Sequence, residues 1–290
     1  MSMKPSIMTR TYWRCYEWPG RTFNFTLLQI LKRIAQSGLG YVDFCEYPLE
    51  FWPMNMTEKE LGLLANRLGE LNLKASGITV PTFSPGLEIL PEEKDRRLIV
   101  KRLGKAIEIA SMLEGKTVMY GISPIPLYAS VDETYKWTLN LFHECSDIAE
   151  KKGIDIAVEF VNDYFTTSET ILKFLEEVGS ENIGLCLEVG NIRARPPNET
   201  LMQHLEKCGE KVKLVHVNDP TNKEWLRSIN VNLDETFKTL HDLGYEGFIV
   251  IESLNDSISC PKLDDEVAKT AKYVGRLVNE ILQGKENEEL

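Results

Sequence analysis

Three glutamates and one histidine each stand at the expected carboxyl end of a short apolar segment. They are Glu159 in IDIAVEF, Glu188 in IGLCLEVGN, His216 in VKLVHVND and Glu252 in FIVIES. A lone glutamate in such a place is usually solvated, and a lone histidine is more often hydrogen-bonded than metal-binding. The same pattern in four successive segments is harder to ascribe to coincidence, because carboxylates and imidazoles are the usual ligands of divalent cations. The four residues together predict one metal site.

An oxygen-rich site with a single imidazole suits Mn(II), with Co(II), Mg(II) or Zn(II) as alternatives. A metal that binds a hydroxy-ketone would polarise its carbonyl and stabilise an enediolate while the neighbouring carbon loses its proton. Glu159 and Glu252 could then act from opposite sides of the substrate, one removing the proton and the other returning it. That chemistry isomerises or epimerises a sugar.

The elements that must position these residues alternate between strand and helix along the chain. We expect strands at 6–13, 41–47, 73–80, 116–122, 154–160, 182–189, 211–217 and 247–253. We expect helices at 23–38, 57–71, 91–113, 131–152, 168–178, 199–208, 233–243 and 264–282, the second opened by a capping box of Thr57 and Glu60. Eight such pairs predict a single (β/α)8 TIM barrel over residues 1–283, followed by a charged tail at 284–290. A doubly wound open sheet is the rival fold.

The composition limits the classes of partner. Among 290 residues, 43% are hydrophobic and the net charge is −11, which argues against a nucleic-acid-binding surface and leaves ample material for one core. No uninterrupted run of about 18 apolar residues suggests a membrane span. The six cysteines are scattered without a CxxC pair, which disfavours a cysteine zinc cage and fits a reduced, cytoplasmic setting.

The second half of the chain resembles the xylose isomerase-like TIM-barrel family, which includes sugar phosphate isomerases and epimerases, ketose 3-epimerases and inosose dehydratases. The resemblance lies in VEFVND, in VHVND and in LGYEGFIVIES. It implies that Glu159, His216 and Glu252 are metal ligands, and that the two glutamates are the acid and base. Two positions depart from the family pattern: Glu188 stands where the family usually has Asp, and Asn191 stands where it frequently has His.

Further residues near the expected strand ends are candidates for contacting a substrate. Aromatic rings pack against the C–H faces of sugars, cations bind anionic groups, and amides or carboxylates orient metal ligands, although burial, subunit contacts and loop capping are alternatives for each. The candidates are Trp13, Glu46, Trp52, Asn162, Asn191, Arg193 and Asp219. We expect an unphosphorylated sugar or cyclitol in preference to a phosphorylated one, because no glycine-rich phosphate loop accompanies the cations.

The sequence thus predicts a metal-dependent sugar isomerase or epimerase. The same proton abstraction could serve a dehydratase or lyase acting on a keto-cyclitol, and a non-catalytic sugar-binding barrel is the third alternative. An endonuclease of the related barrels fits less well, since the chain has four histidines and a negative charge. A homo-oligomer is a further expectation, because an aromatic ring near the barrel mouth could equally lie in a subunit contact.

Overall fold

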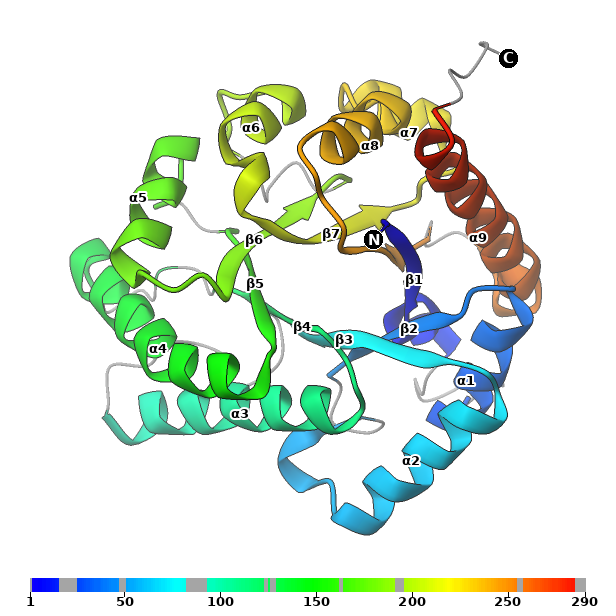
Figure 1. Cartoon of the computed structure of the whole chain (residues 1–290), viewed down its shortest axis with the longest axis horizontal. Helices are drawn as coiled ribbons and strands as arrows, with labels where there is room; N and C mark the ends of the chain where they lie inside the picture. Colours follow the sequence, from blue (N-terminus) through cyan, green and yellow to red (C-terminus); the bar gives the residue numbers. More distant parts are fainter. Residues whose placement is uncertain are drawn as a thin grey trace.

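Eight parallel strands close into a barrel, with helices around its outside (Figure 1). The computed structural model describes residues 2–15, 25–46, 51–81, 93–122, 125, 129–161, 164–190, 196–254 and 258–284, without the side chains of 13–15 and 95. The strands are β1 Lys4–Met8, β2 Tyr41–Cys45, β3 Lys74–Val80, β4 Thr117–Gly121, β5 Asp155–Glu159, β6 Ile183–Glu188, β7 Val212–Asn218 and β8 Phe248–Ser253. Each strand pairs with the next and β1 pairs with β8, so the predicted (β/α)8 barrel is confirmed.

The helices follow the strands in turn. They are α1 Leu27–Gln36, α2 Glu58–Glu70, α3 Glu93–Met112, α4 Val131–Lys152, α5 Ser168–Val178, α6 Leu201–Cys208, α7 Lys223–Ser228, α8 Leu233–Asp242 and α9 Cys260–Leu282, with short 3-10 turns η1 Thr9–Cys15, η2 Pro53–Asn55 and η4 Gly209–Lys211. The predicted capping box of Thr57 and Glu60 opens α2. The short helix α7 was not predicted, and its start is fixed by Asn222, whose side chain accepts a hydrogen bond from the amide of Trp225.

The prediction of a first strand over 6–13 is wrong at both ends. The strand spans Lys4–Met8, and the chain then turns into η1 across the end of the barrel. Two threonine hydroxyls hold the turn to neighbouring strands: Thr9 Oγ1 accepts from the amide of Cys45 at 3.0 Å, and Thr11 Oγ1 donates to the carbonyl of Glu252 at 3.2 Å. These side-chain hydrogen bonds take the place of further strand pairing after Met8. They fix the turn that contains Arg10 at the mouth of the barrel.

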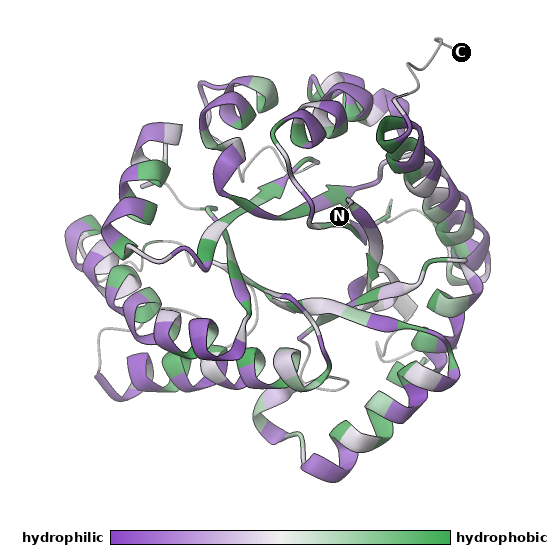
Figure 2. Ribbon diagram, in the orientation of Figure 1, coloured by the Kyte–Doolittle hydropathy of each residue, from purple (hydrophilic) through white to green (hydrophobic). Residues whose placement is uncertain are grey.

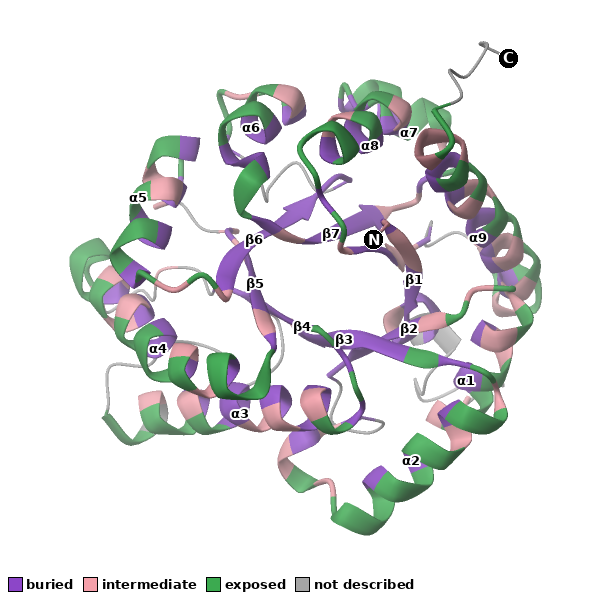
Figure 3. Cartoon of the chain, in the orientation of Figure 1, coloured by how far each residue is buried: buried purple, intermediate pink, exposed green. Residues whose placement is uncertain are grey.

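Apolar side chains fill both faces of the sheet. The main core lies between the outer face of the barrel and the inward faces of the helices, and a smaller cluster inside the barrel contains Met8, Met119, Leu214 and Val250. Figures 2 and 3 show this arrangement as buried, largely apolar strands and helices whose outward faces are polar and exposed. Within the described ranges, none of the helices has the length and apolar character needed to cross a bilayer.

A buried ion pair joins the end of β2 to α3. Arg102 Nε donates to Glu46 Oε1 at 2.9 Å, and the two side chains are 5% and 0% exposed. The guanidinium carbon lies 4.5 Å from the centre of the Trp52 ring. Each partner depends on the other, because an isolated buried charge is costly in a protein interior.

We expect Arg102→Met to lower the free energy of unfolding by about 3–5 kcal/mol, because it leaves the Glu46 carboxylate buried without its cation. The double variant E46M/R102M should recover part of that loss. Arg67→Met is the matched control: Arg67 pairs with Glu70 at 2.8 Å on the surface, so its loss should cost less than about 1 kcal/mol. Urea denaturation measures all three, and equal costs for the two single variants would contradict the expectation.

Candidate metal centre and active site

The predicted quartet occupies the carboxyl ends of four adjacent strands. Glu159 ends β5, Glu188 ends β6, His216 lies near the end of β7, and Glu252 lies near the end of β8. Residues at this end of the strands form the active sites of TIM barrels. Glu188 and His216 are buried, and Glu159 and Glu252 are partly exposed.

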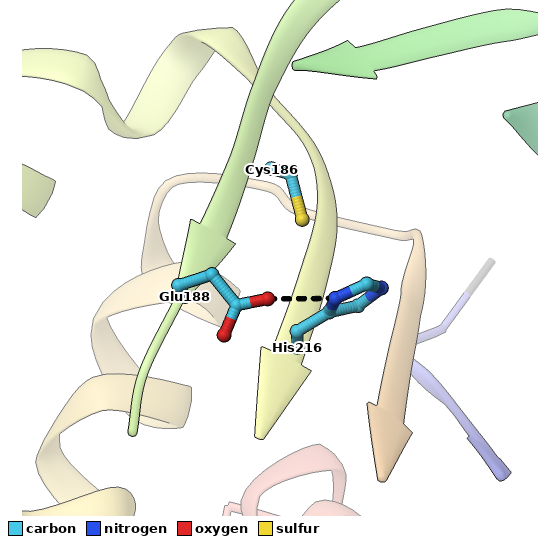
Figure 4. A group of neighbouring side chains, drawn as sticks. All are labelled: Cys186, Glu188 and His216. Carbon is cyan, nitrogen blue, oxygen red and sulfur yellow. Dashed lines mark hydrogen bonds and ion pairs between the residues drawn. The ribbon is translucent and has the colours of Figure 1, made fainter. Parts of the chain in front are cut away.

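Glu188 and His216 are in direct contact. His216 Nδ1 lies 2.7 Å from Glu188 Oε1, and the two residues are register partners on β6 and β7 (Figure 4). Cys186, two residues before Glu188 and on the same face of β6, completes a group whose ligand atoms lie within 4.8 Å of one another. The second imidazole nitrogen, Nε2, is buried and has no hydrogen-bond partner within the described part of the chain.

Asn218 joins two of the carboxylates. Its Nδ2 donates to Glu188 Oε2 at 3.1 Å and to Glu252 Oε2 at 2.9 Å, while its Oδ1 accepts from Ser253 Oγ. The sequence analysis did not single out Asn218. Strand alternation could have found it, because residues two apart on a strand face the same side and Asn218 follows His216 by two.

Arg10 adds a positive charge at the mouth. Its Nη1 donates to Glu252 Oε1 at 2.8 Å, and the side chains are 40% and 13% exposed. The carboxylates of Glu159 and Glu188 also lie close enough to interact with this guanidinium. The sequence analysis missed Arg10 because it placed the residue inside a strand.

Burial and like charges raise the pKa of two carboxyls of the cluster, whereas nearby groups lower the pKa of the third. Burial raises the pKa of Glu188 to about 7, and the neighbouring Glu252 adds to this effect. Burial, Glu188 and Glu252 together raise the pKa of Glu159 well above its ordinary value. Burial also tends to raise the pKa of Glu252. Arg10, His216 and Asn218 outweigh this effect and hold the pKa of that carboxyl below its usual range. The carboxyls of the cluster therefore differ in acidity, and Glu252 is the most acidic of the three.

The pKa of His216 is also shifted. Burial lowers its pKa, but Cys186 and Glu188 outweigh burial, and the net shift is well upward. Burial also raises the pKa of Cys186 to about 12, so the thiol stays protonated in the absence of a metal.

The residues fit a divalent cation. Three carboxylates and one imidazole lie at one barrel end, and within the described residues the Nε2 of His216 is buried without a hydrogen-bond partner. The ligand atoms that lie close together are those of Cys186, Glu188 and His216, and these residues would hold the ion. Of the other predicted ligands, Glu252 has an oxygen 3.9 Å from His216 Nδ1, and Glu159 is near enough to Glu188 and Glu252 for their charges to raise its pKa.

Three other predicted site residues have different surroundings. Glu46 is fully buried, its carboxylate bonds to Arg102, and Trp52 packs against the same guanidinium. Asp219 has a left-handed φ of 46° and accepts from the side chain of Asn222, which caps α7. This geometry gives no support to substrate contact by Glu46, and it matches loop capping for Asp219.

The remaining candidates lie outside the described residues. They are Asn162, Asn191, Arg193 and the side chain of Trp13, and their roles stay predictions.

We expect the metal-free protein to lose stability as the pH rises through about 7. Folding raises the pKa of Glu188 from 4.5 to about 7, so the folded chain keeps a proton that the unfolded chain has already released. The stabilisation from that proton is complete at low pH and disappears as the pH rises through the folded-state pKa. Unfolding by urea in a chelator between about pH 5.5 and about pH 8.5 measures the decline. It should be shallower in Glu188→Gln, and equal slopes would contradict this account.

Known proteins resemble this chain in sequence and in fold. A ketose 3-epimerase of Arthrobacter globiformis is 29% identical over 122 residues, and the alignment covers 41% of each protein. An inosose isomerase of Bacillus velezensis is 23% identical over 267 residues, which cover 86% of this chain and 90% of the relative. The crystal structure of a D-psicose 3-epimerase with D-tagatose, from Clostridium cellulolyticum H10, superposes with a TM-score of 0.73 over 95% of this chain and 99% of that one. At 14% identity, this likeness shows the fold alone.

The family assignment follows from a wider match. The model of one family, the xylose isomerase-like TIM barrel, matches residues 31–276, which include every strand from β2 to β8. The chain therefore belongs to the xylose isomerase-like TIM-barrel family.

Proposed function

We propose that the protein is a divalent-metal-dependent sugar isomerase or epimerase. The observation that carries this proposal is the convergence of Glu159, Glu188, His216 and Glu252 at one end of the barrel. Relatives named ketose 3-epimerase and inosose isomerase support the reaction class. The substrate class is a ketose or keto-cyclitol, because both kinds of compound offer a carbonyl beside a carbon that carries a hydroxyl and an acidic proton.

Glu159 and Glu252 are the proposed acid and base. Strands β5 and β8 are separated by β6 and β7 in the closed barrel, so the two carboxyls reach the mouth from different directions. A substrate held between them can lose a proton to one carboxylate and regain it from the other carboxyl, through an enediolate. Proton return on the opposite face of the same carbon gives an epimer, and return on the neighbouring carbon gives an aldose–ketose isomer.

A bound divalent ion, Mn(II) in our proposal, would act as a Lewis acid that polarises the carbonyl. Co(II), Mg(II) and Zn(II) are the alternatives, and Cys186 as a ligand would favour the softer Zn(II). The chain's own contribution is to hold the four donors in place: Asn218 bridges Glu188 and Glu252, and His216 bonds Glu188.

We expect the protein to exchange one carbon-bound proton of a ketose or an inosose with solvent when Mn(II) is present. In D2O the product should gain one mass unit, and Glu159→Gln or Glu252→Gln should lower kcat by about 10²–10⁴-fold because each removes a proton-transfer group. Glu70→Gln, on the surface of α2, is the control and should keep full activity. Mass spectrometry and NMR of the product follow the exchange.

Two other outcomes of the same assay would contradict the proposal, and each would indicate a different function. A product lighter by one water would make the protein a dehydratase. Ligand binding without any exchange, with Mn(II), Co(II), Mg(II) or Zn(II), would make it a sugar-binding barrel.

We expect Glu188→Ala to weaken Mn(II) binding by about 10–100-fold or more, since even residues that only orient a metal ligand contribute that much. Glu188→Asp restores the residue usual in the family and keeps the carboxylate, so its Mn(II) affinity should stay within about tenfold of the parent. Isothermal titration calorimetry measures both. Unchanged affinity and activity in Glu188→Ala would remove Glu188 from the ligand set.

A further inference from the structure

Every carboxyl oxygen of Glu188 and Glu252 already has a hydrogen-bond partner. Glu188 Oε1 lies 2.7 Å from His216 Nδ1, and Glu188 Oε2 accepts from Asn218 at 3.1 Å. Glu252 accepts from Arg10 on Oε1 and from Asn218 on Oε2, at 2.8 and 2.9 Å. A cation that binds these carboxylates must therefore take the place of at least one of these partners, or share its oxygen.

The contact with Arg10 is the one best placed to give way. The side chains of Glu188 and His216 are 1% and 0% exposed, so their bond is enclosed by the barrel. Arg10 is 40% exposed, and it belongs to η1 rather than to a strand. A guanidinium in this position can leave Glu252 and remain hydrated at the mouth without any strand having to move.

The distribution of charge also favours Arg10 as the group that a cation displaces. Within the described residues, Arg10 is the only lysine or arginine that pairs with Glu188 or Glu252. It also interacts electrostatically with Glu159 and Glu188, so its charge acts on all three carboxylates. A divalent ion on the same carboxylates would repel this guanidinium strongly, because both charges would lie within a few ångströms in a partly buried site.

We propose that Arg10 is an exchangeable counter-ion: it neutralises Glu252 before a divalent cation binds, competes with that cation, and after displacement donates to the substrate oxygen that becomes negative in the enediolate. The second half of this inference rests on the proposed function. A divalent ion and one guanidinium would then offset the charges of Glu159, Glu188 and Glu252 beside a neutral imidazole, with no excess positive charge from these groups to attract a phosphate.

Two substitutions distinguish the effect of the positive charge of Arg10 from the effect of its planar guanidinium group. Arg10→Gln removes the charge, so it should bind Mn(II) about tenfold more tightly or better, the lower end of the Coulomb range for such a pair. Arg10→Lys keeps the charge but loses the planar fork, so its Mn(II) affinity should stay within about threefold of the parent while kcat falls about 10²-fold or more. Arg67→Gln, which breaks an exposed Arg–Glu pair of the same length, should change neither quantity.

Titration calorimetry with MnCl2 at about pH 8 gives the affinities, and circular dichroism with thermal melting shows that each variant is folded. An Mn(II) affinity of Arg10→Gln equal to that of the parent would overturn the competition. A crystal structure of the Mn(II)-loaded protein in which Arg10 still donates to Glu252 would overturn the displacement, and full kcat in Arg10→Lys and Arg10→Gln would overturn the role toward substrate.

These outcomes are separable from failure of the proposed function. If the parent protein binds no divalent ion and Arg10→Gln binds one, Arg10 does compete with the cation. The proposed metal-dependent activity of the natural chain is then wrong. If the parent binds Mn(II) and exchanges substrate protons while the Arg10 variants behave like it, the function stands and the inference falls.

Discussion

The constraint on which this site depends is the burial of three like-charged carboxyls at one end of a parallel barrel. Burial disfavours the charged form of each, and their mutual repulsion adds to that cost. Within the described residues, Arg10 brings positive charge, His216 lies within hydrogen-bond distance of Glu188, and Asn218 donates two hydrogen bonds. Burial and mutual repulsion still raise the pKa of Glu159 and Glu188, and a cluster of this chemistry suits a divalent cation.

The barrel achieves this arrangement through register rather than through sequence proximity. Glu188 lies opposite His216 because the register of β6 and β7 shifts between Leu185 and Cys186. A second shift, between Val217 and Asn218, places Asn218 opposite Ser253 on β8, where the serine hydroxyl bonds the asparagine oxygen. That bond leaves the amide nitrogen of Asn218 free to face both carboxylates. Two local irregularities in strand pairing thus orient the residue that bridges the site.

The sequence predicted the barrel and the four residues at its mouth because both depend on local patterns. Apolar segments that each end in a chemically active residue mark strand ends wherever the strands later pair. Arg10 depends instead on a 3-10 turn, which no periodicity indicates, whereas the alternation of strand β7 could have indicated Asn218 but not the register shift that orients it. Glu46 could have been placed correctly: Cys45 faces the barrel interior, so the next residue points outward, toward Arg102 on α3.

Glu188 shows how a single methylene can alter such a site. Its carboxylate reaches His216 with one oxygen and Asn218 with the other, so the longer side chain is held at both oxygens. An aspartate at this position is one methylene shorter and would place its carboxylate nearer the β6 backbone, farther from both partners. The glutamate therefore brings its negative charge closer to β7, where His216 and Asn218 lie.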